Sequence, residues 1–371
     1  MDKTLKYRLF PSKHQSKLLQ SQLDECRWLY NKLLEERRDS WEQRHDGLSY
    51  FKQCKRITEL KAERPSLGNA YSQSLQNVAD RLDKAFQAFF RRVKSGEKPG
   101  YPRFKGFDRY DSFTYTQFGF QLNDSLHLAK VGDVKIKLHR QPFGQIKTCI
   151  IRRQAGKWYA CFTIQYEQEP LPKSDMAVGI DVGLKSFATL STGDKIANPR
   201  FFRTDERALA KAQRKLSKLE KGTPERLKAK KVVRRIHERI FNRRHNFIHQ
   251  EARKLVNTFG IIAVEKLNIK GLMDGNWRSM NRSIGDVAWA QFRQCIQYKA
   301  EDAGRMYVEV NPRGTTQRCS RCHSIVPKDL SVRIHSCPVC GLVLDRDLNA
   351  SFNILALGLQ DVGKIPRSPA L

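Results

Sequence analysis

The sequence has no uninterrupted apolar stretch of about 18 residues, the length that a membrane-spanning helix requires. Its opening, MDKTLKYRLF, turns polar at once, unlike a secretory signal peptide. Acidic residues are scarce, since 38 Asp and Glu accompany 69 Lys and Arg, and the formal net charge is +31. Such an excess of one sign opposes compaction of the free chain and attracts polyanions. We therefore expect a nucleic acid, rather than a membrane surface, as the partner.

Cysteine is too sparse for a disulfide scaffold, because the 371 residues include nine and five of these are scattered singly. This usage indicates a reducing, cytoplasmic compartment. The other four form two C-x-x-C pairs with fourteen residues between the pairs: Cys319, Cys322, Cys337 and Cys340. Four thiolates at this spacing predict one tetrahedral Zn²⁺ in a zinc ribbon, a closed site with a structural role. A nearby histidine, His323 or His335, is the alternative fourth ligand.

The first half of the chain predicts a β-rich domain with a helical insertion. Residues 3–10 alternate as a strand, and 113–168 contain several short alternating strands with glycine-containing turns. This pattern is typical of a small β-barrel, which residues 3–10 could complete. Between these strands, apolar residues recur with helical spacing over 12–37 and 72–93. A linker at 170–175 and the length of the chain favour two or three domains.

The loop 97–115, EKPGYPRFKGFDRYDSFTY, interleaves glycine, proline, aromatic and basic residues without a period. This composition suits a segment that follows a phosphate backbone and stacks on bases. Its candidate nucleic-acid contacts are Tyr101, Arg103, Phe104 and Lys105. The alternative is an ordinary connector whose aromatic rings pack into a core.

A second basic segment, 203–254, holds 18 Lys and Arg against 6 acidic residues. Gly222, Thr223 and Pro224 divide it into two predicted helices. A solvated helical hairpin is the ordinary interpretation of a charged pattern, but this excess of one sign is too large for pairing within the segment. We therefore expect it to contact nucleic acid.

Acidic residues follow apolar strands at three places in the second half of the chain. Residues 177–180 lead into Asp181, 261–264 into Glu265, and 342–344 into Asp345 and Asp347. A single acid after a strand is usually a turn or a helix cap, but three recurrences indicate a shared crevice. Carboxylate oxygens suit Mg²⁺, and two such ions about 4 Å apart can clamp a scissile phosphate. The spacing does not separate Asp345 from Asp347 as the third acid.

Several of these segments resemble a known family. VGIDVGLKSFATLS, IAVEKLNIKGL, WAQFRQCIQYKAEDAG, VEVNPRGTTQRCSRCH and CPVCGLVLDRDLNASFNIL are similar to motifs of the TnpB (OrfB) proteins of insertion sequences, relatives of the type V CRISPR effector nucleases. YRLFPSKHQ and CRWLYNKLLEER resemble that family's N-terminal region. The similarity extends over nearly the whole chain. His323 and Ser351 depart from the family pattern, which commonly has glycine and alanine at these positions.

The resemblance implies an α/β multidomain fold. It consists of a split RuvC (ribonuclease H-like) nuclease domain with an inserted zinc ribbon, plus an N-terminal wedge β-barrel carrying an inserted helical recognition lobe. The implied boundaries are 1–12 and 97–170 for the wedge, 13–96 for the lobe, 171–312 and 342–371 for the nuclease, and 313–341 for the ribbon.

The implied function is RNA-guided cleavage of double-stranded DNA beside a short motif that the protein reads. The guide RNA would come from the same transposable element, and the protein would act as a monomer in a prokaryotic cytoplasm. The family pattern makes Asp181, Glu265 and Asp347 the catalytic acids, and it selects Asp347 over Asp345. The alternatives are a transposase acting directly on transposon ends, a guided repressor that does not cleave, and an unguided zinc-ribbon DNA-binding protein.

A guide can pair only with DNA that is already open, so the protein must first recognise a short duplex. The predicted helix 72–93 is the candidate reader, since amides on a rigid helix suit base edges and nearby cations suit phosphates. Its candidate contacts are Gln73, Gln76, Asn77, Arg81 and Lys84. The alternative is an ordinary amphipathic helix with solvated amides.

Overall fold

A computed structural model describes residues 2–107, 109–116, 118–274, 277–329 and 331–364. The chain divides into two compact units, Met1–Glu167 and Gln168–Leu371. Residue 108 of the basic loop, and residues 275–276 and 365–371 of the expected nuclease segment, lie outside the described residues. Within the described ranges, no helix is long and apolar enough to cross a membrane.

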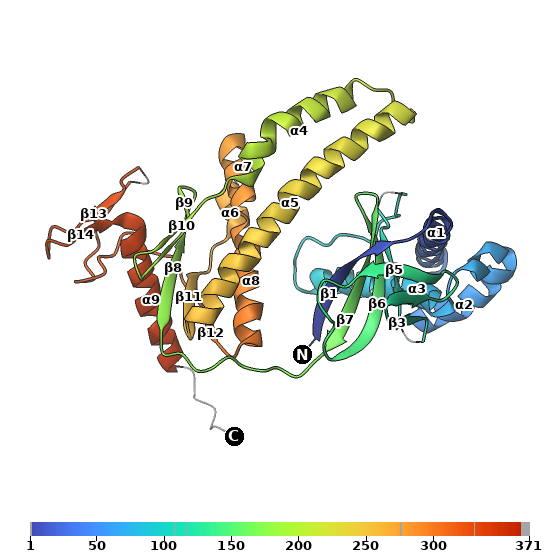
Figure 1. The fold of residues 1–371 in the computed structure, drawn as a ribbon, viewed down its shortest axis with the longest axis horizontal. Helices are drawn as coiled ribbons and strands as arrows, with labels where there is room; N and C mark the ends of the chain where they lie inside the picture. The colour runs from blue at the N-terminus through green and yellow to red at the C-terminus, as the bar shows by residue number, and fades with distance from the viewer. Residues whose placement is uncertain (1, 108, 117, 275–276, 330, 365–371) are drawn as a thin grey trace. The chain divides into compact units, whose positions relative to one another are not determined.

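The first unit contains a seven-stranded antiparallel sheet with the order β2-β6-β7-β1-β5-β4-β3 (Figure 1). Its strands are β1 (Asp2–Phe10), β2 (Ser112–Tyr115), β3 (Phe120–Leu122), β4 (Ser125–Leu128), β5 (Gly132–Lys137), β6 (Gln145–Gln154) and β7 (Lys157–Gln165). The prediction that the opening strand joins the later ones is confirmed, because β1 pairs with both β5 and β7.

The expected barrel is not closed by hydrogen bonds among the described residues, since β2 and β3 form opposite edges of the sheet. These two strands are nevertheless consecutive, and the chain from Tyr115 to Phe120 can span at most about 18 Å. A flat sheet of seven strands would place its edges about 29 Å apart. The sheet must therefore curl strongly, as an incomplete barrel does.

Three α-helices separate β1 from β2: α1 (Lys13–Arg44), α2 (Tyr50–Glu63) and α3 (Ser72–Lys94), with a 3₁₀ turn, η1, at Pro65–Asn69. Helix α1 begins with a capping box, in which Ser12 and Gln15 exchange side-chain to backbone hydrogen bonds. The two helices predicted from apolar spacing are confirmed, whereas α2 was not predicted.

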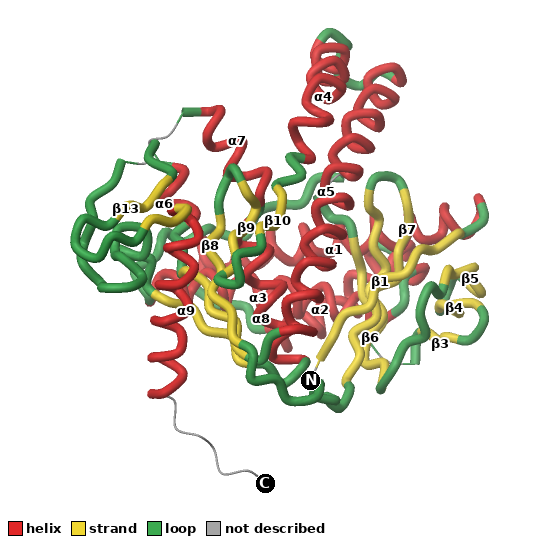
Figure 2. The backbone as a smooth tube through the Cα atoms, turned by 60° about the vertical axis from the view of Figure 1, so that its left-hand side comes forward, coloured by secondary structure: helices red, strands yellow, loops and turns green. Residues whose placement is uncertain are grey.

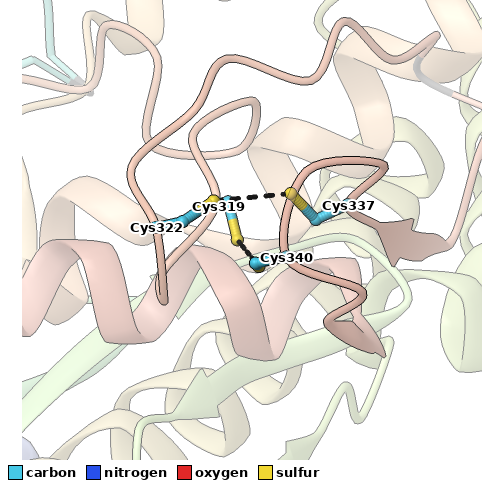
Figure 3. A group of neighbouring side chains, drawn as sticks. All are labelled: Cys319, Cys322, Cys337 and Cys340. Carbon is cyan, nitrogen blue, oxygen red and sulfur yellow. Dashed lines mark hydrogen bonds between the residues drawn. The ribbon is translucent and has the colours of Figure 1, made fainter.

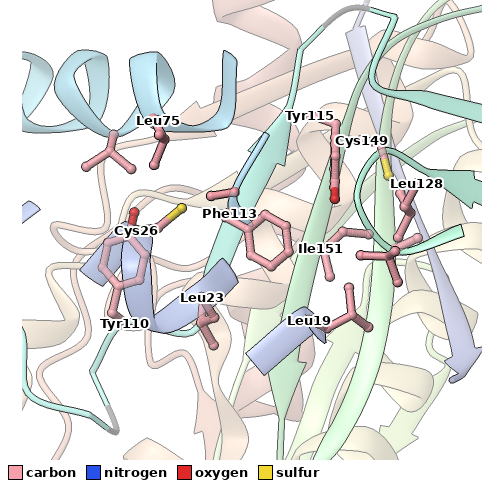
Figure 4. Packing of buried hydrophobic residues seen from close by; sticks show 14 of the residues in the cluster. Leu19, Leu23, Cys26, Leu75, Tyr110, Phe113, Tyr115, Leu128, Cys149 and Ile151 are labelled. Carbon is pink, nitrogen blue, oxygen red and sulfur yellow. The ribbon is translucent and has the colours of Figure 1, made fainter. Parts of the chain in front are cut away.

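The helices and the sheet of the first unit share one hydrophobic core. Figure 4 shows Leu19 and Cys26 of α1 and Leu75 of α3 facing Phe113 of β2 and Ile151 of β6. The helical insertion therefore packs on the sheet and has no separate core of its own.

The second unit is built on a mixed five-stranded sheet with the order β10-β9-β8-β11-β12. Its strands are β8 (Ala177–Val182), β9 (Ser186–Leu190), β10 (Lys195–Ala197), β11 (Ile261–Glu265) and β12 (Met306–Val310). β8, β11 and β12 are parallel, whereas β9 and β10 continue antiparallel from β8.

Helices cover both faces of this sheet, which explains its continuous apolar runs. On one face, Val178, Ile180, Ile262 and Val264 pack in a cluster with residues of α5 (Pro224–Thr258) and α8 (Trp289–Asp302). On the other face, Ala263 packs with α9 (Arg346–Lys364). Figure 1 shows the sheet between α9 and the α5–α8 pair.

The basic segment forms two antiparallel helices, α4 (Phe201–Ser217) and α5, as predicted. The Thr223 side chain accepts a hydrogen bond from the Arg226 N–H at the start of α5, and Pro224 occupies the first turn. Figures 1 and 2 show the tip of this hairpin standing away from the five-stranded sheet.

Two short helices, α6 (Ile269–Met273) and α7 (Arg278–Val287), follow β11, and a two-stranded ribbon follows β12. The ribbon consists of β13 (Ile334–Ser336) and β14 (Val343–Asp345). The sequence suggested that 341–344 would be a strand of the main fold. It instead pairs with β13, because the turn around the last two cysteines folds it back on its neighbour.

Candidate active site and cysteine cluster

Asp181 and Glu265 lie side by side on neighbouring parallel strands. Ile180 is paired with Val264 in the register of β8 and β11, so the next residue on each strand is one of the two acids. Adjacent residues of a strand point to opposite faces, so both carboxylates lie on the face away from α5 and α8. This is the face that α9 covers.

Two glycines allow α9 to pack directly against the sheet, because neither position has room for a side chain. A Cβ atom on Gly179 would lie 2.1 Å from the Ser351 carbonyl oxygen, and one on Gly358 would lie 2.4 Å from Cβ of Ala263. Ser351 thus lies over Gly179, two residues before Asp181. Asp347 is one helical turn before Ser351, so the start of α9 carries its carboxylate toward Asp181 and Glu265.

Asp181 interacts electrostatically with the two other acids. Burial raises the pKa of Asp181 well above its usual range, and the negative charges of Glu265 and Asp347 raise it further. The guanidinium of Arg346 opposes this effect. A buried, mutually repelling group of carboxylates is stable in ionised form only when a cation compensates it.

Glu265 is 7% exposed and is held from two sides. The hydroxyl of Thr315 donates a hydrogen bond to its carboxylate, and Arg293 of α8 donates to its backbone carbonyl at 3.0 Å. Burial raises the pKa of Glu265, and the hydrogen bond from Thr315 partly offsets this rise.

Asp345 and Asp347 have different environments, although they are two residues apart. One oxygen of Asp345 accepts from the backbone N–H groups of Asp347, at 2.9 Å, and Leu348, at 3.2 Å, so it caps α9. Its other oxygen lies 2.8 Å from Nζ of Lys195. Burial acts to raise the pKa of Asp345, but Lys195 and the backbone N–H groups outweigh it and lower the pKa. Both oxygens of Asp345 therefore have partners within the protein.

Arg346 donates from Nε and Nη2 to a single oxygen of Asp347, at 3.1 and 3.0 Å. Its Nη1 donates to the carbonyl of Val332 in the ribbon. Arg346 thus connects Asp347 to the ribbon. Sequence reasoning missed Arg346, although it stands between the two aspartates of the motif.

The donor set suits a hard divalent cation such as Mg²⁺, which prefers carboxylate oxygens and retains waters. The carboxylates are spread more widely than the thiolates. Across the part of the chain that the structure describes, only the four cysteines bring three or more His, Cys, Asp or Glu donor atoms within 4.8 Å of one another.

The four predicted cysteines converge in the ribbon (Figure 3). Sγ of Cys319 lies 3.6 Å from that of Cys340, and Sγ of Cys322 lies 3.5 Å from that of Cys337. Tetrahedral Zn²⁺ with bonds of about 2.3 Å would separate its sulfur ligands by about 3.8 Å. The cluster could therefore hold zinc.

A left-handed turn follows each cysteine pair, and neighbouring groups shift the pKa values of the thiols. The hydroxyl and N–H of Ser324 lower the pKa of the Cys322 thiol to about 6. At Cys340 the N–H of Leu342 acts to lower the pKa, but burial and the neighbouring thiols outweigh it and raise the pKa to about 12. His323 has φ 63° and Gly341 has φ 69°, so each occupies the left-handed turn after its pair. His335 is buried and contacts Lys328 through Nδ1, not the sulfur atoms. Neither histidine replaces a cysteine in the cluster.

The candidate motif-reading residues lie on α3, but they differ in accessibility. Gln76 is exposed and Asn77 is partly exposed, whereas Gln73 accepts a hydrogen bond from Thr116. Arg81 donates to the Ser112 carbonyl at 2.7 Å and to the Thr114 hydroxyl at 2.6 Å. The Arg81 side chain thus fastens α3 to β2 rather than extending toward a ligand.

Lys84 is exposed and pairs with Asp80 at 2.7 Å. In the loop, Tyr101 packs edge-on against Phe86 and Phe89 of α3, yet remains 45% exposed.

The remaining candidate nucleic-acid contacts in the loop also differ in accessibility. Phe104 lies beneath the guanidinium of Arg38 and is 46% exposed, and Arg103 is exposed. Asn31 of α1 forms two hydrogen bonds with the backbone of Lys105, which fixes the loop. The loop is therefore anchored to the core and still exposes aromatic rings and a cation, and its contact with nucleic acid stays a prediction.

Three further polar residues were not singled out from the sequence: Thr315, Asn349 and Asn353. They lie between the acids and the cysteines and are buried. The available signal was the pair of asparagines four residues apart on an otherwise apolar helix face, because buried amides require specific partners.

Family comparisons match most of the chain in three parts. A family described as "Probable transposase", OrfB_IS605, matches residues 161–276, and "Cas12f1-like, TNB domain" matches 289–354. A family described as "Helix-turn-helix domain", HTH_OrfB_IS605, matches 1–46. In this structure those residues form β1 and the single helix α1.

Full-length relatives are also similar. A Streptomyces pristinaespiralis protein named "Putative RNA-guided DNA endonuclease" is 35% identical over 96% of this chain and 89% of its own length. The Escherichia coli (strain K12) protein "Putative RNA-guided DNA endonuclease InsQ" is 30% identical over 95% of this chain and 91% of its own length. The solved structure of "the mini-RNA-guided endonuclease CRISPR-Cas_phi3" covers 97% of this chain and 92% of its own, with a TM-score of 0.49 and 9% identity. The resemblance predicted from the motifs is confirmed, and the chain belongs to the OrfB (TnpB) family of insertion-sequence proteins.

Proposed function

We propose that this protein is the RNA-guided DNA endonuclease of a transposable element, and that it hydrolyses phosphodiester bonds with divalent metal ions held by Asp181, Glu265 and Asp347. One structural observation carries the proposal. Three carboxylates from separate parts of the sequence are brought together on the α9 face of the five-stranded sheet, where burial and mutual repulsion favour the binding of a cation. The names of the full-length relatives give the reaction class and the guide.

Each acid has a distinct part in this proposal. Asp181 and Glu265 present oxygens from adjacent strands, and Asp347 adds a third from the start of α9. When bound, divalent ions would activate a water molecule and stabilise the leaving oxygen. Arg346 holds one oxygen of Asp347, which orients the other toward the ions. Asp345 caps α9 and so fixes the position from which Asp347 extends.

The same proposal assigns roles to the rest of the chain. The second unit is the RuvC-like nuclease with its zinc ribbon, and the first unit is the wedge with its recognition helices. Guide RNA from the same element and double-stranded target DNA are the partners, and the excess of 31 positive charges supports binding of both. The protein would act as a monomer in the cytoplasm.

The decisive experiment is cleavage of a plasmid that carries a guide-matched target, by protein copurified with its RNA. Asp181→Ala, Glu265→Ala and Asp347→Ala should each abolish cleavage in Mg²⁺ while target binding persists. The matched pair Asp347→Asn and Asp345→Asn tests the choice of the third acid, since both substitutions remove one charge at almost constant volume. Cleavage by Asp347→Asn, with Asp345→Asn inactive, would reverse the assignment.

The description "Probable transposase" favours one second candidate, a reaction at the transposon ends themselves. The same three acids could serve strand joining, because both reactions attack a phosphodiester. The products separate the two: guide-dependent breaks in a matched target support the endonuclease, and joined transposon ends without any guide support the transposase.

A further inference from the structure

A buried polar layer connects the acidic site to the cysteine cluster. Thr315 lies in the turn between β12 and the first cysteine pair, and it is 2% exposed. Its hydroxyl reaches two oxygens, the Glu265 carboxylate and, at 3.0 Å, the Pro312 carbonyl. A hydroxyl carries one hydrogen, so it donates to one of them at a time. The bond to Glu265 fixes the orientation of that carboxylate relative to the turn.

Helix α9 holds the other side of the same turn through two asparagines. Asn353 donates to the carbonyl oxygens of Thr315, at 2.8 Å, and Arg318, at 2.7 Å. Asn349 donates to the Arg318 carbonyl at 2.8 Å and accepts from the Ser320 N–H at 2.9 Å. Both amides are at least 96% buried, so losing these partners would leave costly unsatisfied groups. The turn is thereby fixed to the helix that carries Asp347.

This turn also contains the first zinc-site cysteine. Cys319 lies between Arg318 and Ser320, the two residues that Asn349 contacts. Ordering of the cysteine pair by a metal therefore orders the backbone from which the Thr315 hydroxyl extends. Conversely, a cation that fixes the Glu265 carboxylate also fixes its hydrogen-bond partner, Thr315, and so orders the same turn.

We propose that Thr315 is a positioning residue for Glu265, and that it couples the two metal sites through Asn349 and Asn353, so that occupation of either site raises the affinity of the other. The proposal rests on the proposed function, in which Glu265 binds a divalent cation. Coupling of this kind is reciprocal, so each site reports on the other. The coupling can therefore be measured without DNA cleavage.

The first test measures zinc release from the purified full-length protein with its RNA. A thiol-reactive mercurial displaces the metal, and a colorimetric chelator reports the rate, with and without Mg²⁺. Mg²⁺ should slow release from the wild type and from Thr315→Ser, which keeps the hydroxyl. It should have no effect on Thr315→Val, which has nearly the same shape without the hydroxyl. Thr316→Val is the matched control and should respond to Mg²⁺ as the wild type does.

The second test measures the Mg²⁺ concentration that gives half-maximal cleavage. Thr315→Val should raise this concentration about 10-fold or more, the usual effect of losing a residue that orients a metal ligand. Thr315→Ser should restore it. If Thr315→Val cleaves more slowly than the wild type but reaches half-maximal cleavage at the same Mg²⁺ concentration, the positioning role is wrong.

Two outcomes keep this proposal separate from the proposed function. If Thr315→Val does not fold, Glu265→Gln tests the coupling from the other end, and Mg²⁺ should no longer slow zinc release from that variant. If Mg²⁺ does not change the rate of zinc release from the wild type, the proposed coupling is wrong, even if guided cleavage is intact. A wild type that responds to Mg²⁺ in zinc release but cleaves no guided target would instead refute the proposed function.

Discussion

Asp181 occupies a position that is unfavourable for a charged carboxylate. It lies on a buried strand beside two other acids, and burial and repulsion raise its pKa well above the usual range. A carboxyl group whose pKa is higher in the folded state binds protons more tightly there than in the unfolded chain. Its contribution to stability is therefore complete at low pH and is lost as the pH rises through the folded-state pKa.

Because the pKa of Asp181 is raised in the folded state, we predict that Asp181→Asn stabilises the metal-free protein. At pH 8 the substitution removes the free-energy cost of keeping a carboxyl group with a raised pKa in the folded state, and the melting temperature should rise by about 1–3 °C. The gain should shrink as the pH falls, because the raised pKa of Asp181 favours its protonated form in the folded state. Thermal melts with and without Mg²⁺ measure this, and Mg²⁺ should stabilise the wild type more than the variant.

Asp345→Asn is the control, for which we expect a change in melting temperature of the opposite sign. The pKa of Asp345 is lowered, so its charge stabilises the folded state above the unfolded-state pKa and is lost as the pH falls. This variant should melt at a lower temperature than the wild type at pH 8. A lower melting temperature for Asp181→Asn under the same conditions would contradict the assignment of Asp181 as a strained carboxylate.

The sequence identified the acids at this scale but not their supporting residues. Asp181 and Glu265 could be found because each follows an apolar run. Asp345 and Asp347 could not be separated without the family pattern, because two residues apart on a strand share a face. In the structure α9 begins between them, so one caps the helix and the other extends from its first turn. Thr315 was missed because its role depends on a contact fifty residues away.

At the scale of elements, the ribbon is too small to have an extensive core, and it relies on its cysteines. Its hydrophobic cluster consists of Cys319, Cys337 and Leu342 with a few half-buried neighbours. Metal-binding free energy is folding free energy in such a module.

We therefore predict about one tightly bound Zn²⁺ per chain, lost in Cys319→Ser or Cys337→Ser. Both variants should cleave more slowly than the wild type, because the ribbon borders Asp347 through Arg346. Metal analysis of freshly purified protein measures this, with Cys54→Ser as the control, since Cys54 lies outside the cluster. Less than about half an equivalent of zinc in the wild type would contradict the prediction.

Helix α3 gives a second test at this scale, for the reading of the motif beside the target. Gln76→Ala and Asn77→Ala should weaken discrimination between flanking motifs, because an amide suits base edges. Lys84→Ala should weaken binding to all motifs and reduce the salt dependence. Cleavage of a library with randomised flanks measures both effects. An unchanged preferred flank in both amide variants would place the reader elsewhere.

Arg81 serves as the structural control on the same helix. Because its guanidinium is bound to β2, Arg81→Ala should lower the melting temperature of the protein rather than change the preferred flank.

Elements with a clear period were predictable, and elements defined by tertiary contacts were not. The strands from β1 to β9 and helices α1, α3, α4 and α5 follow from apolar spacing and turn residues. The short helices α6 and α7 have no strong apolar period of their own. They form where the chain after β11 packs against the hydrophobic core of the second unit. The strand β14 was expected in the main sheet, because a three-residue apolar run does not identify its partner.

At the scale of the whole molecule, positive charge is the dominant feature, and it is concentrated in the α4–α5 hairpin. This hairpin holds more than a quarter of the 69 Lys and Arg residues, in a segment with few acids. Acids such as Asp205, which pairs with Arg239, neutralise only a minority of these charges. The remainder can be compensated by phosphates, whose neutralisation releases condensed counterions.

The last prediction measures this compensation. Lys228, Lys231 and Arg235 are exposed on α5 at helical spacing, so they share one face. Replacing all three with glutamine should make the negative slope of log affinity against log salt concentration for duplex DNA shallower, by about 0.9 for each phosphate contact that is lost, or nearly 3 in total. The charge-conserving triple variant, Lys228→Arg, Lys231→Arg and Arg235→Lys, should keep the wild-type slope. Filter-binding or fluorescence-anisotropy titrations between 50 and 300 mM salt, at about six concentrations, supply the slopes. Equal slopes for the two triple variants would mean that this face of α5 does not contact nucleic acid, and the excess charge of the hairpin would then need a different polyanion.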